Sequence, residues 1–297
     1  MLYFIRFYNV TIHLTYVWGK IIVARRKEMK ITRKYALGII GLGHMGTAIA
    51  RGAVRKEYIE RYRIAVYDHS EHAKRDCLIE GFDNLEHIED LVNQSHIVLL
   101  AVRPQQIEGV LEKIQNCDIN TVLSIVTGVS IAHLQESLHN VPIIRAMPNT
   151  PLQINEGATA LCMSKNCKAD DYDFVFQLFA SMGVTKTVKE SQMDDIVAVH
   201  GSTPAYVYYF VHCILEDAKQ RGIDEDVARA LLVQTIIGAG KLMQNSADKS
   251  LQDFISEVCS EGGTTIEAIH TLEKENMKQI IHDANEKCIH RAKELGK

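Results

Sequence analysis

Six residues near the start of a predicted helix have the types and the spacing that bind the pyrophosphate of a dinucleotide. They are Gly41-Leu42-Gly43-His44-Met45-Gly46. In a G-x-G-x-x-G turn between a strand and a helix, the first glycine permits the tight turn and the second lets backbone approach the phosphates. The third lets the helix pack closely on the strand, and the free N–H groups of the helix N-terminus face the phosphates. We therefore predict that all six residues contact a dinucleotide cofactor.

The stretch Asp68-His69-Ser70 follows the second predicted strand and indicates how the adenosine ribose is bound. Asp68 lies 22 residues after Gly46, where a carboxylate accepts hydrogen bonds from ribose hydroxyls. The same carboxylate repels a 2′-phosphate, and His69, mostly neutral at pH 7, does not offset that repulsion. Ser70 offers one hydrogen bond to a phosphate. The cofactor is therefore expected to be NADH or NADPH, with a preference for NADH.

Two further turns are expected to line the cofactor because each follows a strand of the same predicted sheet. The first is Ala101-Val102-Arg103-Pro104, and the second is Thr127-Gly128-Val129. In an open parallel sheet, ligands bind at the carboxyl ends of the strands. An ordinary strand-to-helix loop is the alternative for each turn.

A second anion site is indicated near the C-terminus, where two glycines precede two threonines. The stretch is Gly262-Gly263-Thr264-Thr265-Ile266-Glu267. Its T-x-x-E pattern predicts a capping box that opens a helix. The N–H groups of such an N-terminus can bind a small carboxylate substrate. A plain helix cap without a ligand is the alternative.

The elements that must position these turns alternate between strands and helices up to about residue 190. Apolar runs predict strands over residues 35–40, 63–67, 97–102, 121–126, 143–146, 157–163 and 185–188. The segments between them predict helices over residues 44–56, 70–79, 105–114, 130–137 and near 170–182. This α/β alternation predicts a Rossmann-type, doubly wound parallel sheet over residues 35–190.

Residues 191–297 have a helical pattern only, which predicts an all-α domain after the dinucleotide-binding domain. Pro204 opens a predicted helix and Gly222 closes it. The stretches 205–215 and 231–239 are apolar almost all round, and a helix that is hydrophobic on every face must be buried on every face. One small helical domain does not easily cover both stretches, so we predict a homodimer. Burial within the same chain is the alternative.

The first 34 residues differ from the rest of the chain in charge and in aromatic content. They hold eight Lys/Arg, one acidic residue and six of the twenty aromatic residues, whereas the remainder holds 25 basic and 36 acidic residues. Charged and polar residues interrupt the apolar run 2–23, which argues against a membrane-spanning helix. Because Met29 is a second possible start, we interpret residues 1–34 as a dispensable leader. An ordered or membrane-surface extension and a targeting peptide are the alternatives.

The composition and the cysteine and histidine spacing exclude several classes of protein. The 297 residues are 46% hydrophobic and 24% charged, close to the globular average, which excludes disordered and collagen-like chains. The seven Cys form no C-x-x-C pair and the thirteen His show no metal-binding spacing. We therefore predict reduced thiols, a cytoplasmic location and no metal. The acidic balance after residue 34 argues against nucleic-acid binding, and we expect no membrane partner.

The chain resembles the pyrroline-5-carboxylate reductases over about residues 36–296, because the motifs of that family occur in the family's order. The most specific stretches are Gly201-Ser202-Thr203-Pro204-Ala205-Tyr206 and Ser260-Glu261-Gly262-Gly263-Thr264-Thr265. The Gly-rich turn, the Ala-Val-Arg-Pro turn and Arg145-Ala146-Met147-Pro148-Asn149-Thr150-Pro151 match as well. The resemblance implies a Rossmann domain and an interlocked helical dimerisation domain, with dimers that often assemble into larger rings.

The resemblance also implies a reaction, the reduction of 1-pyrroline-5-carboxylate to L-proline, which is the last step of proline biosynthesis. Thr265 would then be the catalytic residue that hydrogen-bonds the imine nitrogen, with Gly263 and Thr264 binding the substrate. Glu190 stands where the family has an acid near the site and is expected to bind substrate, with a solvated loop acid as the alternative. Asn149 is expected to contact the cofactor.

Four residues depart from the family pattern near these substrate motifs. Thr203 replaces a glycine and is expected to cap the helix that Pro204 opens. His200 stands where a small residue is common, Glu261 replaces the usual Pro, and Glu257 replaces a common Asn. The departures keep three functions open. These are a pyrroline-5-carboxylate reductase, a related imine or hydroxy-acid dehydrogenase, and a non-catalytic nucleotide-binding regulatory protein.

Overall fold

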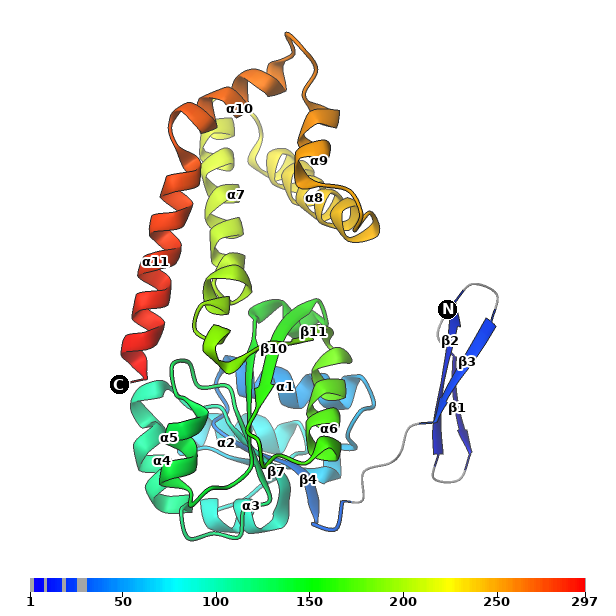
Figure 1. The fold of residues 1–297 in the computed structure, drawn as a ribbon, viewed down its shortest axis with the longest axis vertical. Coiled ribbons are helices and arrows are strands. Elements are labelled where there is room, and N and C mark those ends of the chain that lie inside the picture. Colours follow the sequence, from blue (N-terminus) through cyan, green and yellow to red (C-terminus); the bar gives the residue numbers. More distant parts are fainter. Residues whose placement is uncertain (1–2, 8–9, 18–19, 26–30, 297) are drawn as a thin grey trace. The chain divides into compact units, whose positions relative to one another are not determined.

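The structure is a computed structural model that describes residues 3–7, 10–17, 20–25 and 31–296. The chain divides into two compact units, residues 1–193 with Gly296, and residues 194–295. The first unit contains a large sheet with its helices, and the second is built from helices (Figure 1). The predicted fold class, an α/β domain followed by an all-α domain, is therefore confirmed.

An eight-stranded sheet forms the centre of the first unit. Its strand order is β11-β10-β9-β8-β7-β4-β5-β6, and all neighbours are parallel except β9 and β10. The strands are β4 (Tyr35–Ile40), β5 (Ile64–Tyr67), β6 (Asp83–Asn84), β7 (Ser95–Leu100), β8 (Thr121–Ser124), β9 (Ile143–Pro148), β10 (Gly157–Met163) and β11 (Gly183–Thr187). Because β4 lies between β5 and β7, the order reverses at β4, and such a switch point is where ligands bind.

Two details of the sheet differ from the prediction. β10 runs antiparallel to β9, because the eight residues between the two strands are too few for the crossover that parallel pairing needs. The strand β6 and the helix α3 (Ile88–Gln94) were not predicted. Two residues of strand and two turns of helix are too short to produce a recognisable hydrophobic period.

Helices pack on the sheet and enclose an apolar core (Figure 1). They are α1 (His44–Arg55), α2 (Glu71–Ile79), α4 (Ile107–Ile114), α5 (Ile131–Ser137) and α6 (Ala169–Ala180), with α3 between β6 and β7. Every residue of β4 and of β7 is buried, as expected for parallel strands that are covered on both faces. The turns at the ends of these strands therefore rest on a packed scaffold.

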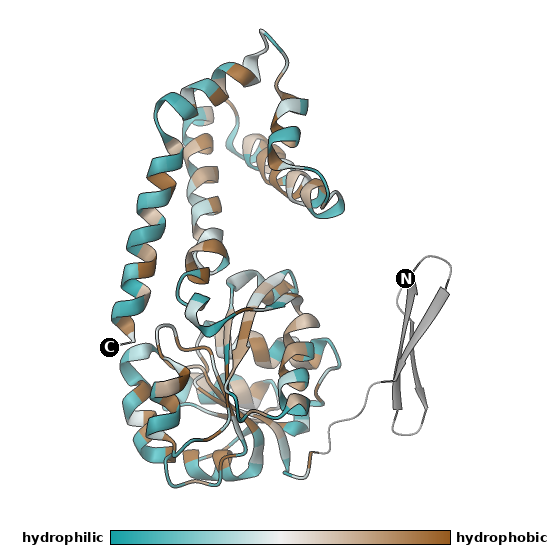
Figure 2. Ribbon diagram, viewed as in Figure 1, coloured by the Kyte–Doolittle hydropathy of each residue, from teal (hydrophilic) through white to brown (hydrophobic). Residues whose placement is uncertain are grey.

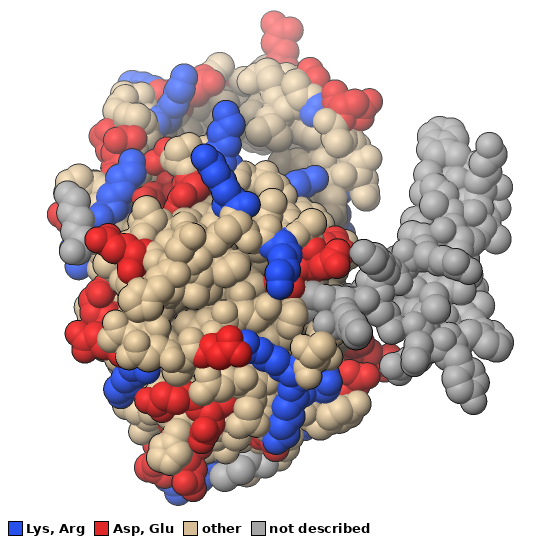
Figure 3. Space-filling model, turned by 60° about the horizontal axis from the view of Figure 1, so that its bottom comes forward, with Lys and Arg blue, Asp and Glu red and all other residues tan. Residues whose placement is uncertain are grey.

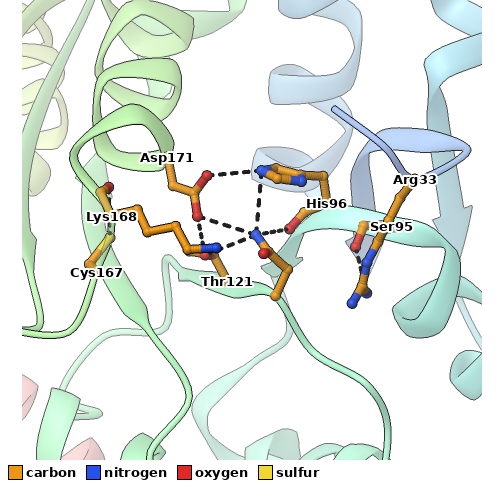
Figure 4. Close-up of polar contacts among 8 residues, drawn as sticks. Arg33, Ser95, His96, Thr121, Cys167, Lys168 and Asp171 are labelled. Atoms are coloured by element: carbon orange, nitrogen blue, oxygen red, sulfur yellow. Dashed lines mark hydrogen bonds and ion pairs between the residues drawn. The ribbon is translucent and has the colours of Figure 1, made fainter. Parts of the chain in front are cut away.

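A buried polar cluster joins β7, β8 and α6 at the amino ends of the two strands (Figure 4). The carboxylate of Asp171 accepts a hydrogen bond from Oγ1 of Thr121 at 2.6 Å and lies 2.9 Å from Nε2 of His96. Asn120 donates to the same carboxylate at 3.2 Å. Burial by itself raises the pKa of Asp171, but the hydrogen bonds from His96, Thr121 and Asn120 outweigh it and lower that pKa. The cluster lies at the edge of the sheet opposite the predicted cofactor turns. Its hydrogen bonds connect β7, β8 and α6.

Arg33 falls within the predicted leader, but its side chain is tied to the first unit. Its Nη1 donates to the carbonyl oxygens of Val92, Ser95 and Asp118 at 3.1, 3.1 and 2.6 Å. Its Nη2 lies 2.9 Å from the Asp118 carboxylate. Ile31 packs against the core. Ile31 and Arg33 therefore belong to the first unit, although both fall within the predicted leader.

The described residues nearer the N-terminus form a separate three-stranded antiparallel sheet. Its strands are β1 (Tyr3–Phe7), β2 (Val10–Val17) and β3 (Lys20–Arg25), with β2 in the centre. Met29, the possible second start, lies outside the described residues. That residues 1–34 are dispensable stays a prediction.

The second unit consists of helices that bury little within one chain. A π-helical turn, Val197–Gly201, precedes α7 (Thr203–Gln220), α8 (Glu225–Asn245), α9 (Leu251–Val258), α10 (Thr264–Lys274) and α11 (Met277–Leu295). Among the described residues of this unit, only Ala198 and Ala292 are buried. Large apolar side chains of α7 and α8 are exposed, including Tyr209 at 70% and Leu231 at 66%, and Figure 2 shows brown residues along both helices.

The charged surface is mixed in sign. Lys/Arg and Asp/Glu side chains are interspersed on the face drawn in Figure 3. Several exposed charges pair with a neighbour, such as Arg51 with Glu80 and Arg221 with Asp217. Of the helices in the described part of the chain, none has the length and apolar character needed to span a bilayer.

Candidate active site

The Gly-rich turn joins β4 to α1, and its backbone requires glycine. Gly41 has a φ of +100°, and a Cβ there would lie 2.7 Å from the carbonyl oxygen of Ala101. A Cβ at Gly46 would lie 2.1 Å from the carbonyl oxygen of Gly41. At Gly43, by contrast, a Cβ would meet no described atom within 4 Å. The space before the N-terminus of α1 is therefore open, which fits a pyrophosphate held by backbone N–H groups.

Asp68 follows β5 and uses both carboxylate oxygens to hold nearby backbone. Oδ2 accepts a hydrogen bond from the N–H of Leu42 at 2.7 Å, and Oδ1 accepts one from the N–H of Ser70 at 2.8 Å. Nδ1 of His69 lies 3.4 Å from Oδ1. Since each carboxylate oxygen has about two acceptor sites, the acid can also accept from ribose hydroxyls. The hydrogen bond to Leu42 gives Asp68 a role in shaping the Gly-rich turn that the motif alone does not reveal.

The other predicted cofactor residues follow strands at the same carboxyl edge. The N–H of Ala101, the first residue of turn 101–104, donates to the carbonyl of Ile40 at 2.8 Å. Gly128, in the centre of turn 127–129, has a φ of +83°. Asn149 follows β9, and its Oδ1 accepts from the N–H of Ala158 at 2.8 Å, so its side chain supports β10. The sheet thus brings the predicted turns to one edge, and their contacts with a cofactor stay predictions.

A cavity of about 370 Å³ lies beside the Gly-rich turn. Its lining comes from that turn, from α1 and from the segment after β9, namely Leu42, Gly43, His44, Thr47, Ala48, Arg51, Arg55 and Gln153. Arg55 donates to the carbonyl of Gln153 at 2.9 Å. Among the polar lining residues, sequence reasoning missed Thr47, Arg51, Arg55 and Gln153. Spacing of three or four residues along α1 from His44 is the signal that could have found the first three.

Glu190 belongs to the first unit and begins a short 3-10 turn, Glu190–Gln192, after β11. Its Oε1 accepts hydrogen bonds from the N–H of Ile131 at 2.6 Å and from Nη1 of Arg145 at 3.3 Å. The side chain of Arg145 is only 4% exposed. The Glu190 carboxylate thus has two partners within the protein, and its contact with a substrate stays a prediction.

The start of α10 has a different cap from the one predicted. Gly263 is the N-cap and Thr264 the first helical residue, without a side-chain cap hydrogen bond, so the predicted capping box of Thr264 and Glu267 is wrong. Gly262 has a φ of +68°, and a Cβ at Gly263 would lie 2.5 Å from Oγ of Ser260. The two glycines let the chain turn into the helix one residue earlier than the box requires. The N–H of Gly263 donates to the carbonyl of Ser260 at 3.0 Å, so the open N–H groups start at Thr264.

Thr265 is the second residue of α10 and is partly buried. Within the described part of the chain, its hydroxyl makes no hydrogen bond. Other threonines in the same unit donate to a carbonyl one turn earlier, Thr271 to Glu267 at 2.9 Å and Thr235 to Leu231 at 2.8 Å. The Thr265 hydroxyl is therefore available to a ligand at the N-terminus of α10.

Two of the unusual residues near the substrate motifs have partners within the second unit. Glu257 forms an ion pair with Lys249, which offsets its negative charge. Thr203 is the first residue of α7, and its hydroxyl donates to the carbonyls of Ala198 at 3.1 Å and Val199 at 2.7 Å. The predicted Thr203 cap is therefore wrong, because the preceding π-helical turn brings two carbonyls within reach of this hydroxyl.

Comparison with known proteins identifies the family. Residues 190–295 match the family model described as pyrroline-5-carboxylate reductase dimerisation, and residues 36–128 match the model described as NADP oxidoreductase, coenzyme F420-dependent. The pyrroline-5-carboxylate reductase of Pasteurella multocida is 34% identical over 267 residues, which cover 87% of this chain and 96% of that protein. The protein of the same name from Glycine max is 32% identical, covering 88% and 96%. The chain belongs to the pyrroline-5-carboxylate reductase family.

Solved structures of the pyrroline-5-carboxylate reductase family share the fold. The structure of Plasmodium falciparum pyrroline carboxylate reductase with NADP bound has a TM-score of 0.81 and 29% identity, covering 89% of this chain and 99% of that one. The 1-pyrroline-5-carboxylate reductase of Streptococcus pyogenes has a TM-score of 0.79 and 29% identity, covering 87% and 98%. The shared fold therefore extends over both units.

Proposed function

We propose that this chain reduces 1-pyrroline-5-carboxylate to L-proline, the last step of proline biosynthesis, with NADH or NADPH as the cofactor. Membership of the family supports this reaction. The observation that carries it within the chain is Thr265, whose hydroxyl has no partner among the described residues and which follows Gly262 and Gly263 at the N-terminus of α10. A hydroxyl in this position can hydrogen-bond the nitrogen of an imine bound at the helix N-terminus.

The Gly-rich turn of the first unit is the proposed site of the dinucleotide. Residues 41–46 would hold the pyrophosphate, Asp68, His69 and Ser70 would surround the adenosine ribose, and turns 101–104 and 127–129 with Asn149 would line the rest. The open space at Gly43 fits a group that backbone must approach closely. When bound, the reduced nicotinamide supplies a hydride to the C=N carbon of the imine.

The N-terminus of α10 is the proposed site of the substrate. The N–H of Gly263 is already bound to Ser260, so we assign the substrate carboxylate to the N–H groups of Thr264 and Thr265, with Gly263 shaping the turn. The hydroxyl of Thr265 would hydrogen-bond the ring nitrogen, because charge on the nitrogen changes as hydride arrives on carbon. A hydroxyl is too weak an acid to be the net proton source. Solvent or a protonated imine therefore supplies the proton, and orientation by Thr265 supplies much of the rate.

A homodimer is the proposed working form, and larger rings of dimers are the proposed extension. The match of residues 190–295 to a dimerisation model supports the dimer. The exposed apolar side chains of α7 and α8 support it independently, because a large apolar face on a single chain marks an interface.

The cytoplasm is the proposed location. All seven cysteines are free, and burial raises the pKa of the Cys77 and Cys162 thiols to about 11. Thiols of such high pKa are weak nucleophiles near neutral pH. Unpaired cysteines are typical of a reducing compartment.

The proposed preference for NADH rests on Asp68, whose carboxylate would repel a 2′-phosphate. Because Asp68 also binds the N–H of Leu42, its replacement would disturb the turn for both cofactors. His69, with a side chain 78% exposed, is the position to change. Arg at position 69 would add a fixed positive charge and leave the acid in place.

The test is a steady-state assay of the purified protein with 1-pyrroline-5-carboxylate and each cofactor. We expect turnover with both, with kcat/KM about tenfold or more higher for NADH. His69→Arg should raise kcat/KM for NADPH about tenfold. The matched control is His72→Arg, which adds the same charge at an exposed histidine on α2. No imine reduction with either cofactor would refute the function. A wild-type preference for NADPH would contradict only the role given to Asp68.

A further inference from the structure

A buried arginine of the first unit faces the carboxylate of Glu190. Arg145 is the third residue of β9, and its side chain is 4% exposed. Its Nη1 lies 3.3 Å from Oε1 of Glu190. A buried guanidinium without an opposite charge is costly in free energy. The pair therefore holds Glu190, which follows β11, against Arg145 of β9.

The same oxygen of Glu190 also holds the start of α5. The N–H of Ile131, the first residue of this helix, donates to Oε1 at 2.6 Å. A helix has no internal acceptor for its first N–H groups. Oγ of Ser130 accepts from the N–H of His133 at 3.1 Å, so Ser130 and Glu190 satisfy two different N–H groups. One carboxylate oxygen thus connects β9, the turn after β11 and the start of α5.

The turn 127–129 lies directly before this helix start. The N-terminal end of the turn follows β8, which is paired with β7 and β9 in the sheet. Gly128, at the centre, has a φ of +83°, and glycine has many alternative conformations. A contact that fixes its other end therefore restricts the conformations of the turn. Glu190 makes such a contact through the N–H of Ile131.

We infer that Glu190 is a positioning residue, which holds turn 127–129 in place for the cofactor through the start of α5 and does not contact the imine. The inference rests on the proposed function, in which this turn lines the dinucleotide. A positioning acid should change the affinity for NADH. An acid that contacts the substrate should change the affinity for the imine instead.

Glu190→Ala and Glu190→Gln separate the two roles in the full-length protein. Ala removes both hydrogen bonds, whereas Gln keeps an oxygen of the same reach and loses the charge. We expect the Kd for NADH, titrated by fluorescence without imine, to rise about tenfold for Ala and about threefold for Gln. The KM for the imine at saturating NADH should not change. Hydrogen exchange of residues 127–131 should be faster in Glu190→Ala, and Glu136→Ala, exposed on the same helix, is the matched control.

The opposite result would overturn the inference. A rise in the imine KM for both variants, with the NADH Kd and the exchange rates of wild type, would assign Glu190 to the substrate. Wild-type values in all three measurements would overturn it as well. NADH binding and exchange need no turnover, so they decide the inference even if the chain reduces no imine. If Glu190→Ala does not fold, Glu190→Asp replaces it, because the shorter side chain cannot reach both partners.

Discussion

In the first unit, β4 and β7 are buried along their whole length, and the apolar side chains of the sheet, α1 and α6 form one core. In the second unit, only Ala198 and Ala292 are buried among the described residues, although α7 and α8 carry many large apolar side chains. Removal of apolar surface from water is the main drive for folding. One chain therefore provides a complete core for the first unit, whereas the helices of the second unit need a partner. The proposed cofactor residues lie in the unit that has a complete core. The proposed substrate residues lie in the unit whose helices need a partner.

The largest expected effect comes from a charge on the apolar surface of α8. Leu231 is 66% exposed in the single chain, and in the proposed dimer a Glu at this position would be buried without a partner. Leu231→Glu should weaken the dimer at least ~1,000-fold, about 4 kcal/mol, and abolish imine reduction. Analytical ultracentrifugation over a range of concentrations measures the dimer Kd. A fluorescence titration should find that NADH still binds, because the core of the first unit is complete.

The control for this comparison is Gln244→Glu, an exposed polar position on the same helix. It adds the same charge outside the apolar stretch and should leave the dimer unchanged. The assignment of this apolar surface to the dimer would be contradicted if both variants dissociated equally. It would also be contradicted if both stayed dimeric. Loss of NADH binding in Leu231→Glu would contradict the independence of the first unit.

The next effect concerns the substrate residues of the second unit. Thr265→Val removes a hydroxyl and keeps the size of the side chain. A lost hydrogen bond to a charged group is worth ~1.5–3 kcal/mol, so kcat/KM for the imine should fall about tenfold to a hundredfold. The Kd for NADH should not change, because the Gly-rich turn is in the other unit. Thr271→Val, whose hydroxyl binds the Glu267 carbonyl on the same helix, should stay within about twofold of wild type. A wild-type kcat/KM for Thr265→Val would end the role assigned to this hydroxyl.

The fold of the first unit is predictable because its signals are local. β4 and β10 have the predicted bounds, since a short apolar run limited by glycine or turn residues is a clear strand signal. The residues of β10 do not indicate that this strand runs antiparallel. Its direction follows from the short connection to β9. The Thr264 capping box failed for a similar reason, because the glycines before it set where α10 begins.

The candidate site is predictable in its glycines and less so in its acids. The glycines act through their own backbone conformation and by letting neighbouring backbone come close. A short motif is enough to encode both properties. Asp68 binds an N–H that lies 26 residues away in the sequence, and Glu190 binds groups that lie 59 and 45 residues away. Only the folded sheet brings such partners together. Sequence spacing therefore identifies the acids as candidates but not the groups that they bind.

The smallest expected effect tests where the first unit begins. A shortened chain that starts at Met29 keeps Ile31 and Arg33, whereas one that starts at Tyr35 loses both. Arg33 donates to three backbone carbonyls, and a buried carbonyl that loses its donor costs about 1–3 kcal/mol. We expect the Tm of the Met29 chain to equal that of the full chain. The Tm of the Tyr35 chain should be about 2–12 °C lower, because 1 kcal/mol shifts the Tm of a domain of this size by about 2–4 °C.

Two point variants of the full chain separate the guanidinium of Arg33 from the rest of this segment. Arg33→Ala should lower the Tm nearly as much as the start at Tyr35 does. Lys34→Ala, which removes an exposed neighbour paired with Asp83, should change it by less than about 2 °C, because exposed ion pairs contribute little. Equal melting of the Met29 and Tyr35 chains would mean that the Arg33 hydrogen bonds add nothing to stability. Loss of the dimer or of solubility in the Met29 chain would instead show that the basic, aromatic residues before it belong to the working protein.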